Sequence, residues 1–230
     1  GGLHGVGVSC VNALSTDLKV SVYRDAKEFQ QEYCIGKPQY EVKQVGTTTE
    51  RGTKVTFQPD ASIFVETVYQ YDILAKRMRE LAFLNKGLKI NLVDLRESAK
   101  DEEGNPKSDN FLSENGLTEF VEYLDSSRET LIPDVIYFEG EKAGVPVEVA
   151  ISYNTSYSEN IHSYVNNICT HEGGTHLTGF RRGLTRTLKN FADKSGYLSK
   201  LKFDIASDDF REGLTAVVSV KVAEPQFEGQ

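Results

Sequence analysis

The sequence has few cysteines, no long apolar run and no excess of basic residues. Its three cysteines, Cys10, Cys34 and Cys169, are widely spaced and form no C-x-x-C pair. This pattern argues against a disulfide framework or a zinc site and favours a reducing compartment. No apolar run approaches the roughly 20 residues that a membrane helix needs, and no secretory leader pattern is present. Because the chain does not begin with Met, we expect it to be an internal fragment.

Acidic residues outnumber basic ones, 34 to 26, which gives the chain a formal net charge of -8. A uniformly basic nucleic-acid-binding surface is therefore excluded, and any DNA contact has to come from a local patch. The hydrophobic content of 39% and the charged content of 26% are typical of a soluble globular protein. A length of 230 residues fits one large domain or two ordinary ones.

The first half of the chain combines strand and helix patterns. Alternating apolar residues predict a strand from Leu18 to Tyr23, and a turn at Asp25–Lys27 leads into a partner strand at Glu28–Tyr33. Apolar residues at helical spacing, Ile73 among them, predict an amphipathic helix at Tyr71–Leu84. Further predicted elements are strands at Thr53–Phe57 and Leu88–Leu92, an exposed loop or hairpin tip at Glu97–Asn110, and a short helix at Leu117–Leu124.

A polar segment that ends in a proline, Ser126–Pro133, is the best candidate for a linker. Beyond it, Thr175–Asp193 has the clearest helix pattern of the chain. Its apolar residues form one stripe from Leu177 to Phe191, and its basic residues occupy the opposite side. The predicted strands of this half lie at Val135–Glu139, Val145–Tyr153, Asn160–Asn166 and Leu214–Val222.

Three glycines, Gly2, Gly5 and Gly7, stand directly before a predicted helix. Without a Cβ they let the backbone bend sharply and approach a ligand closely. The first amide hydrogens of a helix have no intrahelical partner, so such a loop is a natural phosphate cradle. The spacing alone also fits an ordinary turn. It matches neither a P-loop, since no Gly-Lys-Ser/Thr follows, nor a dinucleotide fingerprint.

The full amino-acid sequence of this segment indicates a family more specifically than its glycine spacing does. Residues 1–9, Gly-Gly-Leu-His-Gly-Val-Gly-Val-Ser, and residues 11–15, Val-Asn-Ala-Leu-Ser, resemble the phosphate-binding box of the gyrase B and topoisomerase IV family of ATPases. This family belongs to the GHKL group, which also includes heat-shock chaperones, mismatch-repair proteins and histidine kinases. The resemblance implies that ATP, with Mg²⁺, is bound through a run of residues: Gly2, Leu3, His4, Gly5, Val6 and Gly7.

Further segments resemble the same family in the same order: Gly52–Asp60, Leu74–Asn85, Glu172–Phe180 and Asp208–Val222. Together the matches cover nearly the whole chain. The resemblance assigns Thr53 to the water network around the adenine, and Gln230 to the Gln of a Gln-x-Lys pair in the nucleotide site. Arg24 either matches a family position at the edge of the nucleotide pocket or is a solvated arginine at a strand end.

The resemblance implies an α/β (α+β) chain in two domains. Residues 1–125 would be the back half of a GHKL-type ATPase sandwich, with a mixed sheet and helices on one face. Residues 126–230 would be a ribosomal-S5-domain-2-like transducer domain with a left-handed crossover. ATP would close two B-type subunits around a DNA segment, and the transducer would pass this signal to the cleavage core, which includes an A-type subunit. The implied location is the bacterial cytoplasm, at the nucleoid, without membrane contact.

Three groups that this family needs precede its glycine box: a glutamate base, an asparagine that binds magnesium and an aspartate that binds adenine. None is assignable in this chain, and the lysine of the Gln-x-Lys pair lies beyond Gln230. Phosphoryl transfer depends almost entirely on positioning and charge stabilisation. We therefore expect no catalytic residue in this polypeptide and no ATPase activity from it alone.

The basic side of the helix predicted at Thr175–Asp193 has two interpretations. Arg182, Arg186 and Lys189 fit the solvated side of an amphipathic helix. The resemblance instead implies that this side, together with Arg181, lines the cavity that holds the transported DNA segment, where phosphate contacts need only local positive charge. Both interpretations remain open.

Two histidines, His171 and His176, lie close together in the sequence and flank Glu172. A metal site needs at least a third ligand, and the sequence offers none nearby. A loop that enters a helix is therefore the better interpretation, and we predict no metal site.

The acidic residues Asp208, Asp209 and Glu212 surround Arg211. Such a cluster fits catalysis or metal binding, but Asp is also common in turns, where it accepts local hydrogen bonds. We favour a turn in which Arg211 pairs with one of the carboxylates.

Two other functions remain open at this point. One is a relative from the wider GHKL group, a chaperone or a mismatch-repair clamp, and the other is a non-enzymatic binding module. The wording Gly-Gly-Leu-His-Gly-Val-Gly and Glu-Gly-Gly-Thr-His argues against the first. A DNA-dependent ATPase assay on the full-length protein separates them, because a chaperone should not respond to DNA. The sequence does not distinguish gyrase, which supercoils DNA negatively, from topoisomerase IV, which decatenates it.

Overall fold

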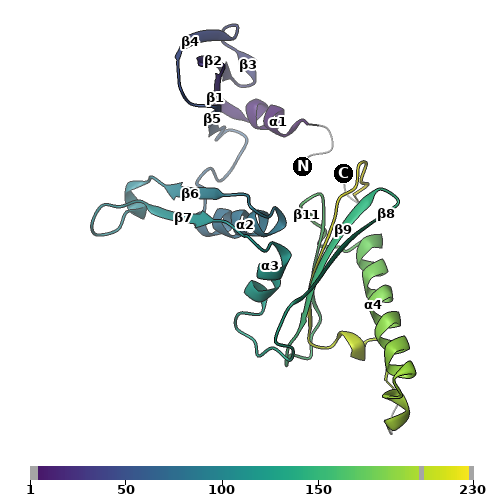
Figure 1. Cartoon of the computed structure of the whole chain (residues 1–230). Coiled ribbons are helices and arrows are strands. Elements are labelled where there is room, and N and C mark those ends of the chain that lie inside the picture. The colour runs from purple at the N-terminus through teal and green to yellow at the C-terminus, as the bar shows by residue number, and fades with distance from the viewer. Residues whose placement is uncertain (1–4, 202–204, 228–230) are drawn as a thin grey trace. The chain divides into compact units, whose positions relative to one another are not determined.

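The computed structural model describes residues 5–201 and 205–227. They form helices and three sheets, which confirms the predicted α/β class. The chain divides into two compact units, residues 1–70 and residues 71–230 (Figure 1). None of the described helices is both long and apolar enough to cross a membrane.

The first unit is a short helix followed by a sheet. Its elements are α1 (Gly7–Ala13), β1 (Ser15–Arg24), β2 (Lys27–Cys34), β3 (Lys37–Pro38), β4 (Lys43–Thr47) and β5 (Gly52–Pro59). The predicted hairpin is confirmed: β1 and β2 pair in antiparallel register, with Arg24 opposite Lys27. Asp25 and Ala26 make the turn with φ of 54° and 59°, the left-handed geometry of a two-residue hairpin.

Among the described residues of this unit the sheet contains no parallel pair, so the expectation that residues 1–125 are the back half of a mixed sheet stays a prediction. The strand order is β3-β2-β1-β5, with β4 also on β2, and every pair is antiparallel. The strands of this unit follow one another through short connections. A parallel pair needs a crossover of a dozen or more residues, so the two-residue connection between β1 and β2 gives antiparallel neighbours.

The second unit holds the larger core. Its first elements are α2 (Tyr71–Leu84), β6 (Ile90–Asp94), η1 (Glu97–Ala99), β7 (Lys107–Phe111) and α3 (Leu117–Leu124). They are followed by β8 (Ile136–Lys142), β9 (Val145–Tyr153), β10 (Asn160–Val165), β11 (Ile168–Cys169), α4 (Thr175–Lys194), η2 (Leu198–Lys200), η3 (Asp209–Arg211) and β12 (Leu214–Val220). The main sheet has the order β11-β10-β12-β9-β8. Its parallel pair, β10 and β12, is joined through α4; the handedness of this crossover stays a prediction.

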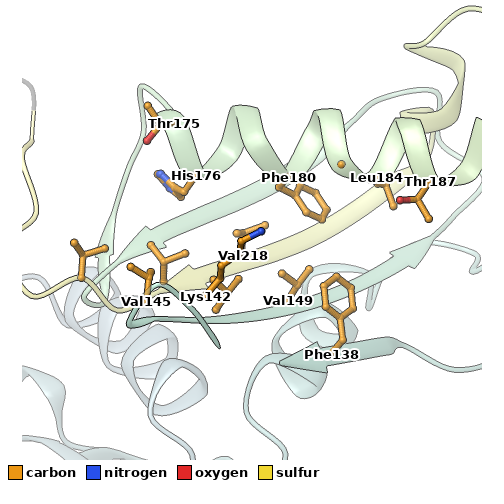
Figure 2. Close-up of a pocket in the computed structure, with 14 residues that line it drawn as sticks. Phe138, Lys142, Val145, Val149, Thr175, His176, Phe180, Leu184, Thr187 and Val218 are labelled. Atoms are coloured by element: carbon orange, nitrogen blue, oxygen red, sulfur yellow. The ribbon is translucent and has the colours of Figure 1, made fainter. Parts of the chain in front are cut away.

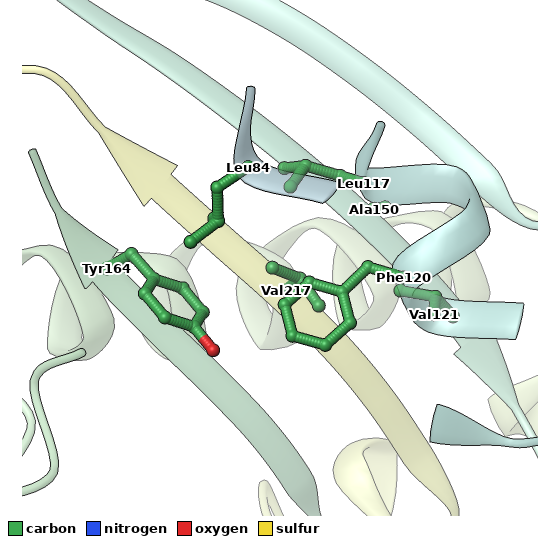
Figure 3. Close-up of a cluster of buried hydrophobic side chains, with 7 residues drawn as sticks. All are labelled: Leu84, Leu117, Phe120, Val121, Ala150, Tyr164 and Val217. Atoms are coloured by element: carbon green, nitrogen blue, oxygen red, sulfur yellow. The ribbon is translucent and has the colours of Figure 1, made fainter. Parts of the chain in front are cut away.

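Strand β12 is buried along its whole length, and its side chains belong to the hydrophobic clusters on both faces of the main sheet. On one face, Val217 packs with a cluster from α2, α3 and the neighbouring strands (Figure 3). The members of this cluster are Leu84, Leu117, Phe120, Val121, Ala150, Tyr164 and Val217. On the other face, Leu214, Ala216 and Val218 pack with Phe180 and Leu184 of α4. Helix α4 is therefore held to the sheet by its apolar side.

Two apolar side chains lie on the surface, although the sequence pattern placed them on buried stripes. The last turns of α4 extend past the sheet (Figure 1). Phe191 in these turns is 62% exposed, and its ring lies 6.3 Å from that of Tyr197 between centroids. Ile73 is 63% exposed. The buried side of α2 instead carries Tyr71, Ala75, Ala82 and Leu84, where two alanines allow a close approach of the neighbouring elements.

A buried polar network fixes the end of α3. The Asp125 carboxylate accepts hydrogen bonds from the Thr215 hydroxyl at 2.6 Å and from the Asn154 side-chain amide at 3.1 Å. Arg128 forms an ion pair with the same carboxylate at 3.1 Å. A buried charge needs such partners, since burying it alone costs several kcal/mol. The network therefore ties the end of α3 to the main sheet.

The close approach of the backbone at Gly213, directly before β12, is testable by substitution. This residue has a φ of 68°, and a Cβ built on it would overlap the carbonyl oxygen of Asn154. Gly144 has a φ of 76°, but nothing lies within 4 Å of its Cβ position. We expect Gly144→Ala to cost about 1–2 kcal/mol, the penalty of a left-handed alanine, and Gly213→Ala to cost clearly more. Denaturant unfolding measures both; equal losses would contradict the close approach at Gly213.

Candidate functional site

The glycine loop predicted to hold phosphate is only partly described. Gly2, Leu3 and His4 lie outside the described residues. Gly5 adopts a φ of 66°, and no atom of the described residues lies within 4 Å of a Cβ at Gly5 or at Gly7. Val6, the residue before α1, is 51% exposed. The described part of the loop is thus a sharp bend whose backbone is open on its outer side, as ligand binding by amide groups requires.

Two further predicted nucleotide residues lie at one end of the β1–β5 ladder. Thr53 pairs with Val22 and is exposed, and Arg24 follows two residues later on β1. Arg24 contacts Asp25 at 3.3 Å, and its side chain is 77% exposed. No hydrogen bond links Thr53 or Arg24 to residues 5–7 within the described part of the chain. Gln230 lies outside the described residues. The roles of these residues stay predictions.

The four basic residues predicted on α4 lie together along one groove. Arg181, Arg182, Arg186 and Lys189 line a surface cavity of about 530 Å³, which we call the α4 groove. Its other lining residues are Thr178, Thr185, Asn190, Ser207 and Arg211. The groove therefore concentrates five cationic side chains on a chain with a formal net charge of -8.

These five cations are not equivalent. Arg182, Arg186 and Lys189 are exposed, and no ion pair or hydrogen bond joins their side chains to any other described residue. Arg181 and Arg211 share one carboxylate, that of Glu159. Three unpaired cations therefore face solvent, and their local field attracts anions along the groove.

Sequence patterns did not place Arg211 in this groove or Glu159 beside it. The predicted turn is confirmed: Arg211 pairs with Asp208 at 2.5 Å, and Asp209 accepts the amide hydrogen of Ala206 at 2.7 Å. The same guanidinium also donates to the Thr185 hydroxyl on α4 at 3.1 Å. These contacts link segments far apart in the chain, and no local spacing indicates them.

The two histidines weighed as metal ligands have other neighbours. His176 Nε2 lies 3.1 Å from the Thr170 hydroxyl, and His171 Nδ1 lies 3.6 Å from the Cys169 sulfur. Within the ranges that the structure describes, no three His, Cys, Asp or Glu side chains are arranged to hold a metal ion.

An apolar cavity of about 770 Å³ lies between α4 and the main sheet (Figure 2). Phe138, Val149 and Val218 line the sheet side, and Phe180 lines the helix side, as Figure 2 shows. Its polar groups are few, and His176 is the histidine among them. Because burial lowers the pKa of His176, its ring tends to stay neutral in the folded protein.

Comparison with known proteins identifies several that the chain resembles. The family model described as DNA gyrase B matches residues 116–230. The DNA gyrase B protein of Cytophaga aurantiaca is 64% identical over 230 residues, which are 100% of this chain and 48% of that protein. That of Halalkalibacterium halodurans is 51% identical over 231 residues, 100% of this chain and 35% of the relative. The chain thus spans about half, or less, of the length of the curated relatives it matches.

Solved structures give the same result. The chain superposes on the 43K ATPase domain of Thermus thermophilus gyrase B, crystallised with an aminocoumarin, with a TM-score of 0.81 and 36% identity, over 98% of this chain and 60% of the other. It also superposes on the ATP-binding domain of Francisella tularensis topoisomerase IV, solved with a small-molecule inhibitor, with a TM-score of 0.75 and 26% identity, over 98% and 59% of the two chains.

The pKa of His176 predicts a pH dependence of stability. Its folded pKa lies below the ordinary value of 6.5, so the unfolded chain binds the proton more tightly. The stability from the neutral ring is therefore present above about pH 6.5 and is lost as the pH falls toward the folded pKa. We expect His176→Gln to reduce the fall in melting temperature between about pH 7.5 and about pH 5. Burial also lowers the pKa of His162, so part of the fall in melting temperature should remain in this variant. An unchanged pH profile would contradict the burial of His176.

Proposed function

Because the chain belongs to the DNA gyrase B family, we propose that it forms the nucleotide-binding and signal-transducing part of the B-type chain of an ATP-dependent type II DNA topoisomerase. The predicted family and the GHKL-type fold are confirmed by these matches. The observation that carries the proposal for this chain itself is the α4 groove, in which three unpaired cations line one side of a helix anchored to the main sheet.

The groove supports contact with a nucleic-acid backbone. Phosphate contacts require positive charge at the surface and no base-specific geometry. Arg182, Arg186 and Lys189 provide it from successive turns of α4, and no described carboxylate neutralises them. The interpretation of these residues as merely the solvated side of a helix does not account for Arg211, which joins them from a segment beyond α4. We therefore favour the DNA-binding role for the groove.

The glycine loop supports triphosphate binding. Its exposed bend at Gly5 leaves the backbone of Val6 and Gly7 open to a ligand. Helix α1 has only seven residues, so we assign the grip to these local amide groups more than to a helix dipole. Thr53 and Arg24 are proposed to border the same nucleotide. The resemblance places the magnesium ligand before residue 1, so the described residues hold the triphosphate and not the ion.

The whole protein is proposed to couple these two sites. ATP binding would close two B-type subunits around a DNA segment, and the signal would pass through the second unit toward a core shared with an A-type subunit. The names of the relatives favour supercoiling by a gyrase over decatenation, and over a chaperone or a mismatch-repair clamp. We place this activity in the bacterial cytoplasm, where the DNA lies.

The boundary between the ATPase and transducer parts, predicted at residues 125–126, stays a prediction. Helix α3 packs on the main sheet through Phe120 and Val121, and Asp125 is bonded to that sheet. The family model also begins at residue 116. These observations favour a boundary just before α3, which the limits of a stable proteolytic fragment would locate.

Nucleotide binding is tested at Gly5. We expect Gly5→Ala in the full-length protein to weaken binding of a non-hydrolysable ATP analogue by at least about tenfold, since a side chain enters the space that the phosphates need. Gly104→Ala is the control, because Gly104 also has a positive φ and open surroundings but lies outside the loop. Calorimetric titration measures both; equal affinities of Gly5→Ala and wild type would contradict the assignment.

DNA binding is tested on α4. Replacing Arg186 and Lys189 together by Gln should flatten the slope of log affinity for duplex DNA against log salt concentration by about 2, about 0.9 for each lost phosphate contact. Lys86→Gln with Lys89→Gln is the matched control, because these lysines of the same unit are exposed and lie away from the groove. If both double variants behave alike, the groove does not contact DNA.

A further inference from the structure

Glu159 lies beside the α4 groove and contacts two of its arginines. It precedes β10, and its carboxylate binds Arg181 in a two-point contact, Oε1 with Nε at 2.9 Å and Oε2 with Nη2 at 2.7 Å. The same Oε1 lies 3.0 Å from Arg211 Nε. The Glu159 side chain is 25% exposed. One carboxylate thus neutralises two of the five cations of the groove. Only its pair with Arg181 has the bidentate geometry that gives strong and oriented pairs; with Arg211 Nε it makes a single ion-pair contact without a hydrogen bond.

Arg181 and Arg211 differ in how exposed they are and in which of their side-chain nitrogens have partners. Arg211 is 17% exposed and is further bonded to Asp208, to the Thr185 hydroxyl and to the Ser207 carbonyl. Its role is to hold the turn against α4. Arg181 is 39% exposed, and its Nη1 has no partner among the described residues. Arg181 is therefore the cation of this pair that a ligand in the groove can reach.

We propose that Glu159 is an internal counter-ion of the α4 groove, which orients Arg181 and competes with a nucleic-acid phosphate for it. This inference rests on the proposed contact between the groove and DNA. In the empty groove the carboxylate keeps Arg181 neutralised, so three cations remain available. Glu159 thereby limits the affinity for the DNA backbone and its dependence on salt, and it is a positioning residue, since it acts through Arg181.

The salt dependence separates this role from a structural one. Each phosphate that a protein cation neutralises releases counter-ions and contributes about 0.9 to the slope of log affinity against log salt. With Glu159 in place, Arg181 exchanges one anion for another and adds little to that slope. Without the carboxylate charge, Arg181 should neutralise one more phosphate. A merely structural role of Glu159 would change the stability of the protein and leave the slope unchanged.

The test uses Glu159→Gln in the full-length protein with duplex DNA between about 50 mM and about 200 mM salt. We expect binding that is severalfold to about tenfold tighter at the low end, a slope steeper by about 0.9, and a difference that shrinks as salt rises. Glu212→Gln is the matched control: it removes the same charge from an exposed residue next to Arg211 that forms no ion pair with a described residue. If Glu159→Gln does not fold, Glu159→Met, which keeps the side-chain length without the charge, takes its place.

A double variant assigns the effect to Arg181. Glu159→Gln combined with Arg181→Gln should return the slope to the wild-type value, because the extra available cation is gone. The counter-ion role would be overturned if the slope in Glu159→Gln were unchanged or shallower. It would also be overturned if Glu212→Gln steepened the slope equally. The Arg186 and Lys189 double variant separates DNA binding by the groove from the counter-ion role of Glu159. If it flattens the slope while Glu159→Gln has no effect, the groove binds DNA and only the counter-ion role fails.

Discussion

The second unit depends on one constraint, the burial of β12 on both faces of the main sheet. All seven residues of this strand are buried, and alternate side chains serve opposite layers. Val217 supports the cluster under α3, whereas Leu214, Ala216 and Val218 support the contact with α4. At roughly 1.5–3 kcal/mol for each fully buried Val or Leu side chain, this strand contributes a large part of the driving force for folding.

The constraint on β12 also determines where charge appears. The apolar side of α4 is held to the sheet through Phe180 and Leu184, so the opposite side, with Arg182 and Arg186, has to face solvent. A helix that is amphipathic in this sense becomes a cationic surface only because the sheet fixes its rotation. The chain can therefore carry a net charge of -8 and still present a local basic groove.

The sequence predicts elements well where one periodicity continues without interruption. The strand expected at Val145–Tyr153 has those bounds, and the helix expected at Thr175–Asp193 ends one residue later. Sequence periodicity does not predict the burial of a side chain where tertiary packing determines it. Periodicity cannot show that α4 extends past the sheet and leaves Phe191 in solvent. Nor can it show that Ala75 and Ala82, and not Ile73, lie on the buried side of α2.

The candidate site was predictable to a similar degree. The basic residues of α4 follow from helical spacing, and the family follows from the wording of the glycine loop. The pairing of Arg181 with Glu159 joins residues 22 positions apart through the fold, and Arg211 reaches the groove from beyond α4. Side-chain pairs of this kind depend on how β10, α4 and the turn before β12 pack, which no local pattern contains.

The most direct test is a structure of the full-length protein with a non-hydrolysable ATP analogue and a duplex DNA segment. We predict that backbone phosphates lie within hydrogen-bonding distance of Arg182, Arg186 and Lys189, along the side of α4 that faces away from β12. A structure in which this side of α4 meets only solvent or protein, while the DNA lies elsewhere, would contradict the proposed function of the groove.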